Sequence, residues 1–106
     1  MSPTPAERER LAAQSRLTKR QLDAITKRLD AMDTRSKDGP WTRRTLELIS
    51  QQPGVVSTVL ARQMRRERLS YKSLVRELRD LGLTYSLDVG WSLSPRGRAY
   101  LKALAE

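Results

Sequence analysis

The basic side chains between positions 60 and 83 are the residues of this 106-residue sequence whose type and spacing best suit a chemical role. The stretch LARQMRRERLSYKSLVRELRDLGL contains seven arginines and lysines in twenty-four positions. Guanidinium and ammonium groups form strong hydrogen bonds with phosphate oxygens, so the cluster favours a polyanionic partner. The alternative is the ordinary solvated face of a helix. A formal net charge of +9 favours nucleic acid first and an anionic membrane surface second.

Other kinds of chemistry lack the residues they need. The sequence has no histidine and no cysteine, which excludes disulfides, thiol chemistry and histidine-based acid–base catalysis, and argues against a zinc site. Its five glycines have neither Walker nor dinucleotide-binding spacing. The carboxylates are scattered, and we expect Glu67, Glu77 and Asp80 to pair with neighbouring arginines on helix surfaces. We therefore predict no metal, no cofactor and no enzymatic activity.

No apolar run in the sequence approaches the roughly 20 residues that a membrane-spanning helix needs. The N-terminus also lacks the apolar core of a signal peptide. We expect no membrane partner and a cytoplasmic location, associated with the nucleoid if the polyanion is DNA.

The first third of the sequence predicts one long helix. We expect a flexible tail over residues 1–4, a helix over 5–34 that begins with a Thr4–Glu7 capping box, and a linker over 35–40. The apolar positions of its second half are spaced 3, 4 and 3, which is heptad spacing. They are Leu22, Ile25, Leu29 and Met32. This stripe favours dimerisation into a homodimer, and the alternative is that it packs on its own domain.

From position 41 onward the pattern changes to short elements separated by turn residues. We expect, in chain order, a helix over 41–52, an extended rung at 55–56, a helix from Ser57, a turn over 65–68, a helix over 70–81, a strand over 83–87, a turn over 88–90, a strand over 91–93 and a helix from Pro95. Gly82 suits the left-handed position after a helix, and Gly97 suits a close approach of two backbones. Tyr85 and Trp91 lie on the same alternating face as Leu87 and Leu93, so we predict that both pack in the core.

This order of elements resembles the winged helix-turn-helix domain of the MarR and PadR groups of bacterial transcriptional regulators. Three stretches carry the likeness, namely PGVVSTVLARQM, LVRELRDLGL and WSLSPRGRAYL. They fall between residues 41 and 104. We accordingly predict a mainly α fold of the α+β type, with a winged helix-turn-helix domain over 41–106 preceded by the long N-terminal helix.

The resemblance implies a sequence-specific double-stranded DNA-binding protein, a small dimeric bacterial transcriptional regulator whose helix over 70–81 enters the major groove. Its base- and phosphate-facing positions correspond to Arg68, Ser70, Lys72, Ser73 and Arg76, and the backbone of one DNA strand would pass Arg65 and Arg66 in the preceding turn. The chain departs from the family at the wing, where an acidic turn, Asp88-Val89-Gly90, replaces a basic one. Insertion of the wing into the minor groove is therefore not expected. The sequence points to no particular effector ligand.

Two other functions remain open on the sequence alone. A winged helix can serve as a protein-interaction module within a larger assembly. A basic chain can also bind nucleic acid nonspecifically, as a packaging or RNA-binding protein. Arginines able to contact base edges, Arg68 and Arg76, favour specific binding. The dispersed positive charge of the N-terminal helix favours nonspecific binding.

Overall fold

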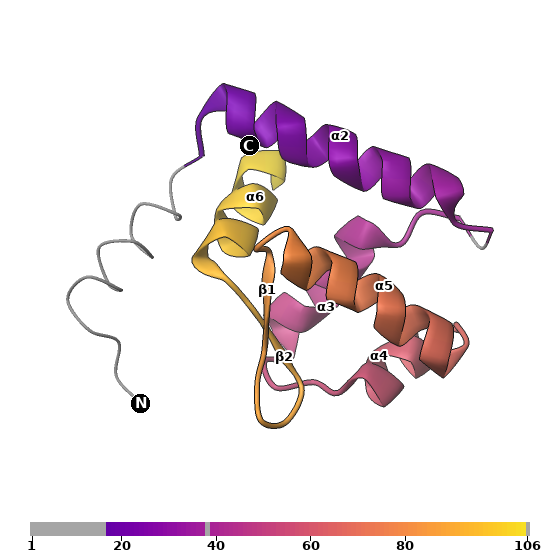
Figure 1. Ribbon diagram of the computed structural model, residues 1–106. Coiled ribbons are helices and arrows are strands. Elements are labelled where there is room, and N and C mark those ends of the chain that lie inside the picture. Colours follow the sequence, from indigo (N-terminus) through magenta and orange to yellow (C-terminus); the bar gives the residue numbers. More distant parts are fainter. Residues whose placement is uncertain (1–16, 38, 106) are drawn as a thin grey trace.

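The computed structural model describes residues 17–37 and 39–105, which form a mainly helical chain with a small antiparallel sheet (Figure 1). The elements are α2 (Lys19–Arg35), α3 (Thr42–Gln51), α4 (Ser57–Gln63), α5 (Arg68–Asp80), β1 (Thr84–Ser86), β2 (Trp91–Leu93) and α6 (Pro95–Ala105). The expected order of helices and strands from position 41 onward is thus present, and the mainly α class is confirmed.

Helix α2 begins at Lys19, so the predicted uninterrupted helix over 5–34 is wrong at Thr18. The backbone of Thr18 is extended, with φ −73° and ψ 161°. Its hydroxyl accepts a hydrogen bond from the Gln21 backbone N–H, and the Gln21 side chain accepts one from the Thr18 N–H. This reciprocal capping box starts α2 at Lys19. The predicted tail over 1–4 and the Thr4–Glu7 box lie outside the described residues. At the other end, α2 stops at Arg35, close to the predicted linker.

The apolar stripe of α2 packs against the chain's own core. Ile25, Leu29 and Met32 are 6%, 2% and 4% exposed, and Leu22 is half-buried against the same cluster. Figure 1 shows α2 crossing above α6 and α5. A hydrogen bond of 3.2 Å joins Thr26 to the Tyr100 hydroxyl of α6.

The prediction that these four residues form a dimer interface is therefore corrected. Heptad spacing reports that a helix has an apolar face, and the α5–α6 surface of the same chain covers that face here. The homodimer stays a prediction, and it would require a different surface.

The core lies where α3, α4, α5 and the hairpin meet. The rings of Trp41 and Tyr71 pack edge to face with centroids 6.2 Å apart, and both residues are fully buried. The Tyr71 hydroxyl is hydrogen-bonded to Thr45 of α3. Asp33, near the end of α2, accepts hydrogen bonds from the backbone N–H groups of Trp41 and Thr42 at 2.8 and 3.0 Å. These bonds fix the chain's entry into α3, whose first N–H groups have no partner within the helix.

The hairpin is joined on its other side to the segment before α4. Strand β2 pairs with β1, with Ser86 opposite Trp91, and Trp91 also forms a bridge with Val55. The Gly54 N–H donates to the Trp91 carbonyl, and the Trp91 N–H donates to the Val55 carbonyl, each at 2.8 Å. The expected extended rung at position 55 and the burial of Trp91 are confirmed.

The burial pattern of β1 differs from the prediction. Tyr85 and Leu87 are 38% and 45% exposed, whereas Thr84 is buried. Leu83 is buried because it closes the end of α5, where its N–H donates to the Leu78 carbonyl. Within β1 only Thr84 is buried, while Tyr85 and Ser86 are exposed, so the strand does not show the alternation that the apolar pattern predicted.

Two glycines allow the close contact between the end of α5 and the start of α6. Gly82 has φ +79° at the left-handed position after α5, as predicted. A Cβ atom at Gly97 would lie 2.2 Å from the Leu83 carbonyl oxygen, so the expected close approach of two backbones is also confirmed. Ser94 completes the contact, because its hydroxyl donates to the Gly82 carbonyl and accepts from the Gly97 N–H.

Candidate nucleic-acid interface

The outward face of α5 brings several of the predicted DNA-binding residues together. Tyr71, Val75 and Leu78 are buried on the inner face of the helix. With 3.6 residues per turn, the positions opposite them form one exposed stripe. It contains Leu69, Lys72, Ser73 and Arg76, and Asp80 follows on the same face one turn after Arg76. Ser70 is also exposed, on the flank of this stripe. The helical arrangement of Lys72, Ser73 and Arg76 expected from the sequence is therefore present.

Helix α5 starts at Arg68, two residues before the predicted start. The reason is Glu67, whose carboxylate accepts hydrogen bonds from the backbone N–H groups of Leu69 and Ser70 at 3.0 and 2.7 Å. The bonds to the Ser70 and Leu69 N–H groups hold the pKa of the Glu67 carboxyl below its ordinary value of 4.5. The prediction that Glu67 pairs with an arginine is thus replaced by a helix cap. Glutamate is not among the preferred caps, so the sequence pattern favoured Ser70 instead.

The turn between α4 and α5 holds an arginine in a backbone conformation that favours glycine. Arg65 has φ +56° and is exposed. The Arg66 N–H donates to the Ala61 carbonyl and the Arg65 N–H to the Arg62 carbonyl, at 2.8 and 3.1 Å. This is a Schellman motif with Arg65 at the left-handed position. A side chain with a Cβ atom costs roughly 1–2 kcal/mol there.

Arg66 has a different use from the predicted phosphate contact. Its guanidinium donates to the Ser36 hydroxyl at 3.0 Å and to the Gly39 carbonyl at 2.9 Å. These bonds join the α4–α5 turn to the segment between α2 and α3. Contact with a DNA phosphate would compete with this internal role, so we remove Arg66 from the candidate interface.

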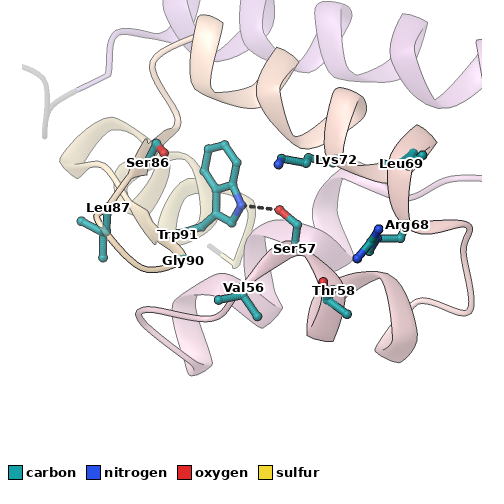
Figure 2. Close-up of a pocket in the computed structure, with 10 residues that line it drawn as sticks. All are labelled: Val56, Ser57, Thr58, Arg68, Leu69, Lys72, Ser86, Leu87, Gly90 and Trp91. Carbon is teal, nitrogen blue, oxygen red and sulfur yellow. Dashed lines mark hydrogen bonds between the residues drawn. The ribbon is translucent and has the colours of Figure 1, made fainter.

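A groove of about 390 Å³ lies between the start of α4, the first half of α5 and the hairpin. Its lining residues are Val56, Ser57, Thr58, Arg68, Leu69, Lys72, Ser86, Leu87, Gly90 and Trp91. Figure 2 shows Arg68 and Lys72 extending from α5 into the space between α4 and the hairpin. The lining thus contains two cations and several hydroxyl groups but no carboxylate. Such a surface can bind an oxyanion, because nothing in it opposes the negative charge.

Other hollows on the described part of the chain have balanced charge. The hollow of about 430 Å³ between α2 and α5 is lined by two arginines, Arg28 and Arg35, and by two carboxylates, Glu77 and Asp80. The hollow beside Trp41 likewise contains two arginines and two carboxylates. Excess positive charge is therefore a property of the groove beside α5 and not of every depression on this basic protein.

Some arginines of the described chain form ion pairs, whereas cations of several helices, such as Lys27 and Arg28 of α2 and Lys102 of α6, do not. Arg35 pairs with Glu77 at 3.2 Å, Arg43 with Glu47 at 3.1 Å, and Arg79 with Asp80 at 3.5 Å. Within residues 17–37 and 39–105, five cations of the α4–α5 region have no carboxylate within ion-pair distance. They are Arg62, Arg65, Arg68, Lys72 and Arg76. Four of these five were predicted from the sequence, and all five are exposed.

The exposed part of the hairpin is apolar and acidic. Tyr85, Leu87 and Val89 are its large exposed apolar side chains, and Asp88 lies at its tip. Residues 84–90 contain no lysine or arginine. The hairpin turn therefore offers no cation to a polyanion.

The described residues contain no group of three or more histidine, cysteine, aspartate or glutamate side chains placed to hold a metal ion. In the same part of the chain, no helix combines the length and apolar character needed to cross a bilayer. Comparison of the chain with protein-family models, with curated proteins and with solved structures found no match.

Proposed function

We propose that this chain is a sequence-specific double-stranded DNA-binding protein, a small regulator of transcription of the winged helix-turn-helix type. In this proposal α4 and α5 are the helix-turn-helix pair, α5 enters the major groove and the β1–β2 hairpin is the wing. The observation that carries the proposal is the groove lined by Arg68 and Lys72 without a carboxylate, which lies directly beside the outward stripe of α5.

The dimensions of α5 suit this role. Its 13 residues correspond to roughly 20 Å of helix. The major groove of B-DNA is about 12 Å wide and admits such a helix. Arg76, in the C-terminal half of the outward stripe, can donate two hydrogen bonds to a guanine edge. Arg68 and Lys72 line the groove at the side of the helix, where the phosphates of one strand would pass, and they supply affinity rather than sequence preference.

Arg65 provides independent support. Non-glycine residues in strained backbone conformations cluster at functional sites. Arg65 is exposed and has no ion-pair partner in the described chain, so the folded protein gains no ion pair from it. A phosphate contact beside the α4–α5 turn would account for keeping an arginine at a position that glycine fits better.

A second candidate is a protein-interaction module, and the exposed hairpin is the observation that favours it. Tyr85, Leu87 and Val89 form an apolar surface without any cation. Such a surface suits a protein partner better than phosphates. Leu87 also lines the basic groove, so DNA and a partner bound through the hairpin would compete there.

Selection of bound fragments from random duplex DNA tests the proposal. A defined motif is the expected result, and for the predicted homodimer it would be a near-palindrome with half-sites about 34–36 Å apart. A flat sequence profile would point to a nonspecific nucleic-acid binder. Absence of recovered DNA would contradict the proposal and favour the protein-interaction module.

A further inference from the structure

Leu69 is a large apolar side chain in the middle of a polar surface. It is 64% exposed, more than any other leucine among the exposed apolar residues of the described chain. Single exposed leucines are common on proteins, so exposure alone carries no inference. The neighbours of Leu69 make its exposure informative, because they are polar or charged. Lys72, Ser73 and Arg76 lie three, four and seven positions further along the same helix face.

The structure fixes Leu69 in this orientation. Tyr71 and Val75 fill the opposite face of α5 and are fully buried, so Leu69 cannot turn toward the core. The N–H of Leu69 donates to the Glu67 carboxylate at 3.0 Å, which anchors the first turn of the helix. Leu69 also borders the groove that contains Arg68 and Lys72. Any polyanion held in that groove would lie against this leucine.

The base edges of the major groove offer few partners to such a side chain. They present hydrogen-bond donors and acceptors, and the 5-methyl group of thymine is the apolar group among the four standard bases. Leucine burial against a donor or acceptor would leave that polar group without a partner, which is unfavourable. Burial against a methyl group is favourable.

We propose that Leu69 is a specificity-determining residue that selects a thymine through its 5-methyl group. This inference rests on the proposed DNA-binding function and adds a base preference to it. The contact is apolar, so it contributes to the choice of sequence without adding to the salt dependence of binding. Arg76, seven residues further along the stripe, would then address a base pair on the other side of the helix centre.

The test uses the duplex recovered from the random selection and the same duplex with single thymines replaced by deoxyuridine, which removes only the methyl group. For the full-length wild-type protein we expect one position per half-site at which uracil weakens binding by roughly threefold to tenfold, the effect of burying one methyl group. Leu69→Ala should bind the thymine duplex more weakly by a similar factor and should not respond to uracil at that position. Ser73→Ala, on the same stripe, is the matched control and should keep the uracil response.

The outcomes separate this inference from the proposed function. Sequence-selective binding that is unchanged by uracil at every position would overturn the role of Leu69 and leave the proposed function standing. A uracil response that persists undiminished in Leu69→Ala would do the same. Failure of the wild-type protein to bind any duplex would overturn both.

Discussion

The indole N–H of Trp91 donates a hydrogen bond of 2.8 Å to the hydroxyl of Ser57, and this bond joins the hairpin to the first residue of α4. Trp91 is buried, and its backbone is also bonded to Gly54 and Val55. Trp91 therefore connects the hairpin to the start of α4, and it also lines the basic groove between them (Figure 2).

Loss of this bond should destabilise the protein modestly. We expect Ser57→Ala to lower the free energy of unfolding by about 1 kcal/mol, the net value of a typical hydrogen bond. Trp91→Phe removes the same donor together with part of a buried ring, so it should cost more. Urea denaturation of both single variants and of the double variant measures the coupling between them. A double variant whose loss equals the sum of the single losses would show that the bond contributes nothing.

Arg65 should be a residue at which stability and DNA binding respond in opposite directions. We expect Arg65→Gly to raise the free energy of unfolding by up to about 1 kcal/mol, because glycine adopts the left-handed conformation without strain. The same change should weaken DNA binding through the loss of one cation. Arg65→Ala is the matched control, because it removes the charge and keeps the strain. Urea denaturation and duplex affinity would be measured on both variants. Unchanged affinity in both would show that Arg65 does not contact the polyanion.

Gly97→Ala should destabilise the junction between α5 and α6. The added methyl group would lie 2.2 Å from the Leu83 carbonyl oxygen, and backbone atoms cannot yield as a flexible side chain does. We expect a loss of about 1–3 kcal/mol in the free energy of unfolding, the range for overpacked sites. Lys102→Ala, on an exposed position of the same helix, is the control and should be nearly neutral. Thermal unfolding compares the stability of the two variants, and equal melting temperatures would contradict the prediction.

The local signals of the sequence were sufficient for much of this architecture. Gly82 was predicted because the left-handed position after a helix depends on its own backbone conformation. Gly97 and Val55 were also predicted, although their partners in the structure, Leu83 and Trp91, lie far away in the sequence. The break at Thr18 was also present in the sequence as a Thr-x-x-Gln capping pattern, but the continuous helical periodicity around it favoured one long helix.

Tertiary context decided the rest. The partner of the Ile25–Leu29 face could not be predicted, because an apolar stripe has the same spacing whether a second copy or the chain's own core covers it. Arg66 was assigned to a phosphate contact because its position in the turn gave no sign of its true partners. Those partners, Ser36 and Gly39, lie about thirty residues away in the sequence. The stripe on α5 followed from periodicity. The groove did not, because the hairpin forms one of its walls.

Glu67 should make stability depend on pH in the acidic range. Its backbone hydrogen bonds hold the pKa of the carboxyl below the ordinary value of 4.5 in the folded chain. A depressed folded pKa contributes stability that is fully present above the unfolded pKa and is lost as the pH falls through the folded pKa. We therefore expect the cap to weaken below about pH 4.5.

The Glu67→Gln variant is the measurement that isolates this effect. Its urea midpoint should be lower than that of the wild type at pH 7 and should approach it as the pH falls below 4.5. Asp88→Asn, at the exposed hairpin tip, serves as the carboxylate control. A constant difference between wild type and Glu67→Gln from neutral to acidic pH would show that the cap does not depend on the charge.

Arg76 and Lys72 should not be equivalent, although both are exposed cations on one face of α5. Arg76 lies in the C-terminal half of the stripe and can donate two hydrogen bonds to a guanine edge, so Arg76→Ala should cost about 1–3 kcal/mol on the preferred duplex and relax the preference at one base pair. Lys72 lines the groove, where a phosphate would lie. Lys72→Ala should weaken binding to preferred and scrambled duplexes alike, and should reduce the slope of log affinity against log salt by about one.

A salt titration of these two variants on both duplexes distinguishes the roles of Arg76 and Lys72. Lys102→Ala is the charge-matched control, because Lys102 belongs to α6, a helix that lies beside α2 in Figure 1. If charge alone drove association, all three variants would lose the same affinity on every duplex, because a distributed positive field does not depend on which cation is removed. Contact at α5 instead requires that Lys102→Ala has little effect and that only Arg76→Ala changes the ratio between preferred and scrambled DNA. Equal losses on both duplexes for Arg76→Ala and Lys72→Ala would reduce the protein to a nonspecific binder. No loss from either would show that the basic stripe of α5 is an ordinary solvated helix face.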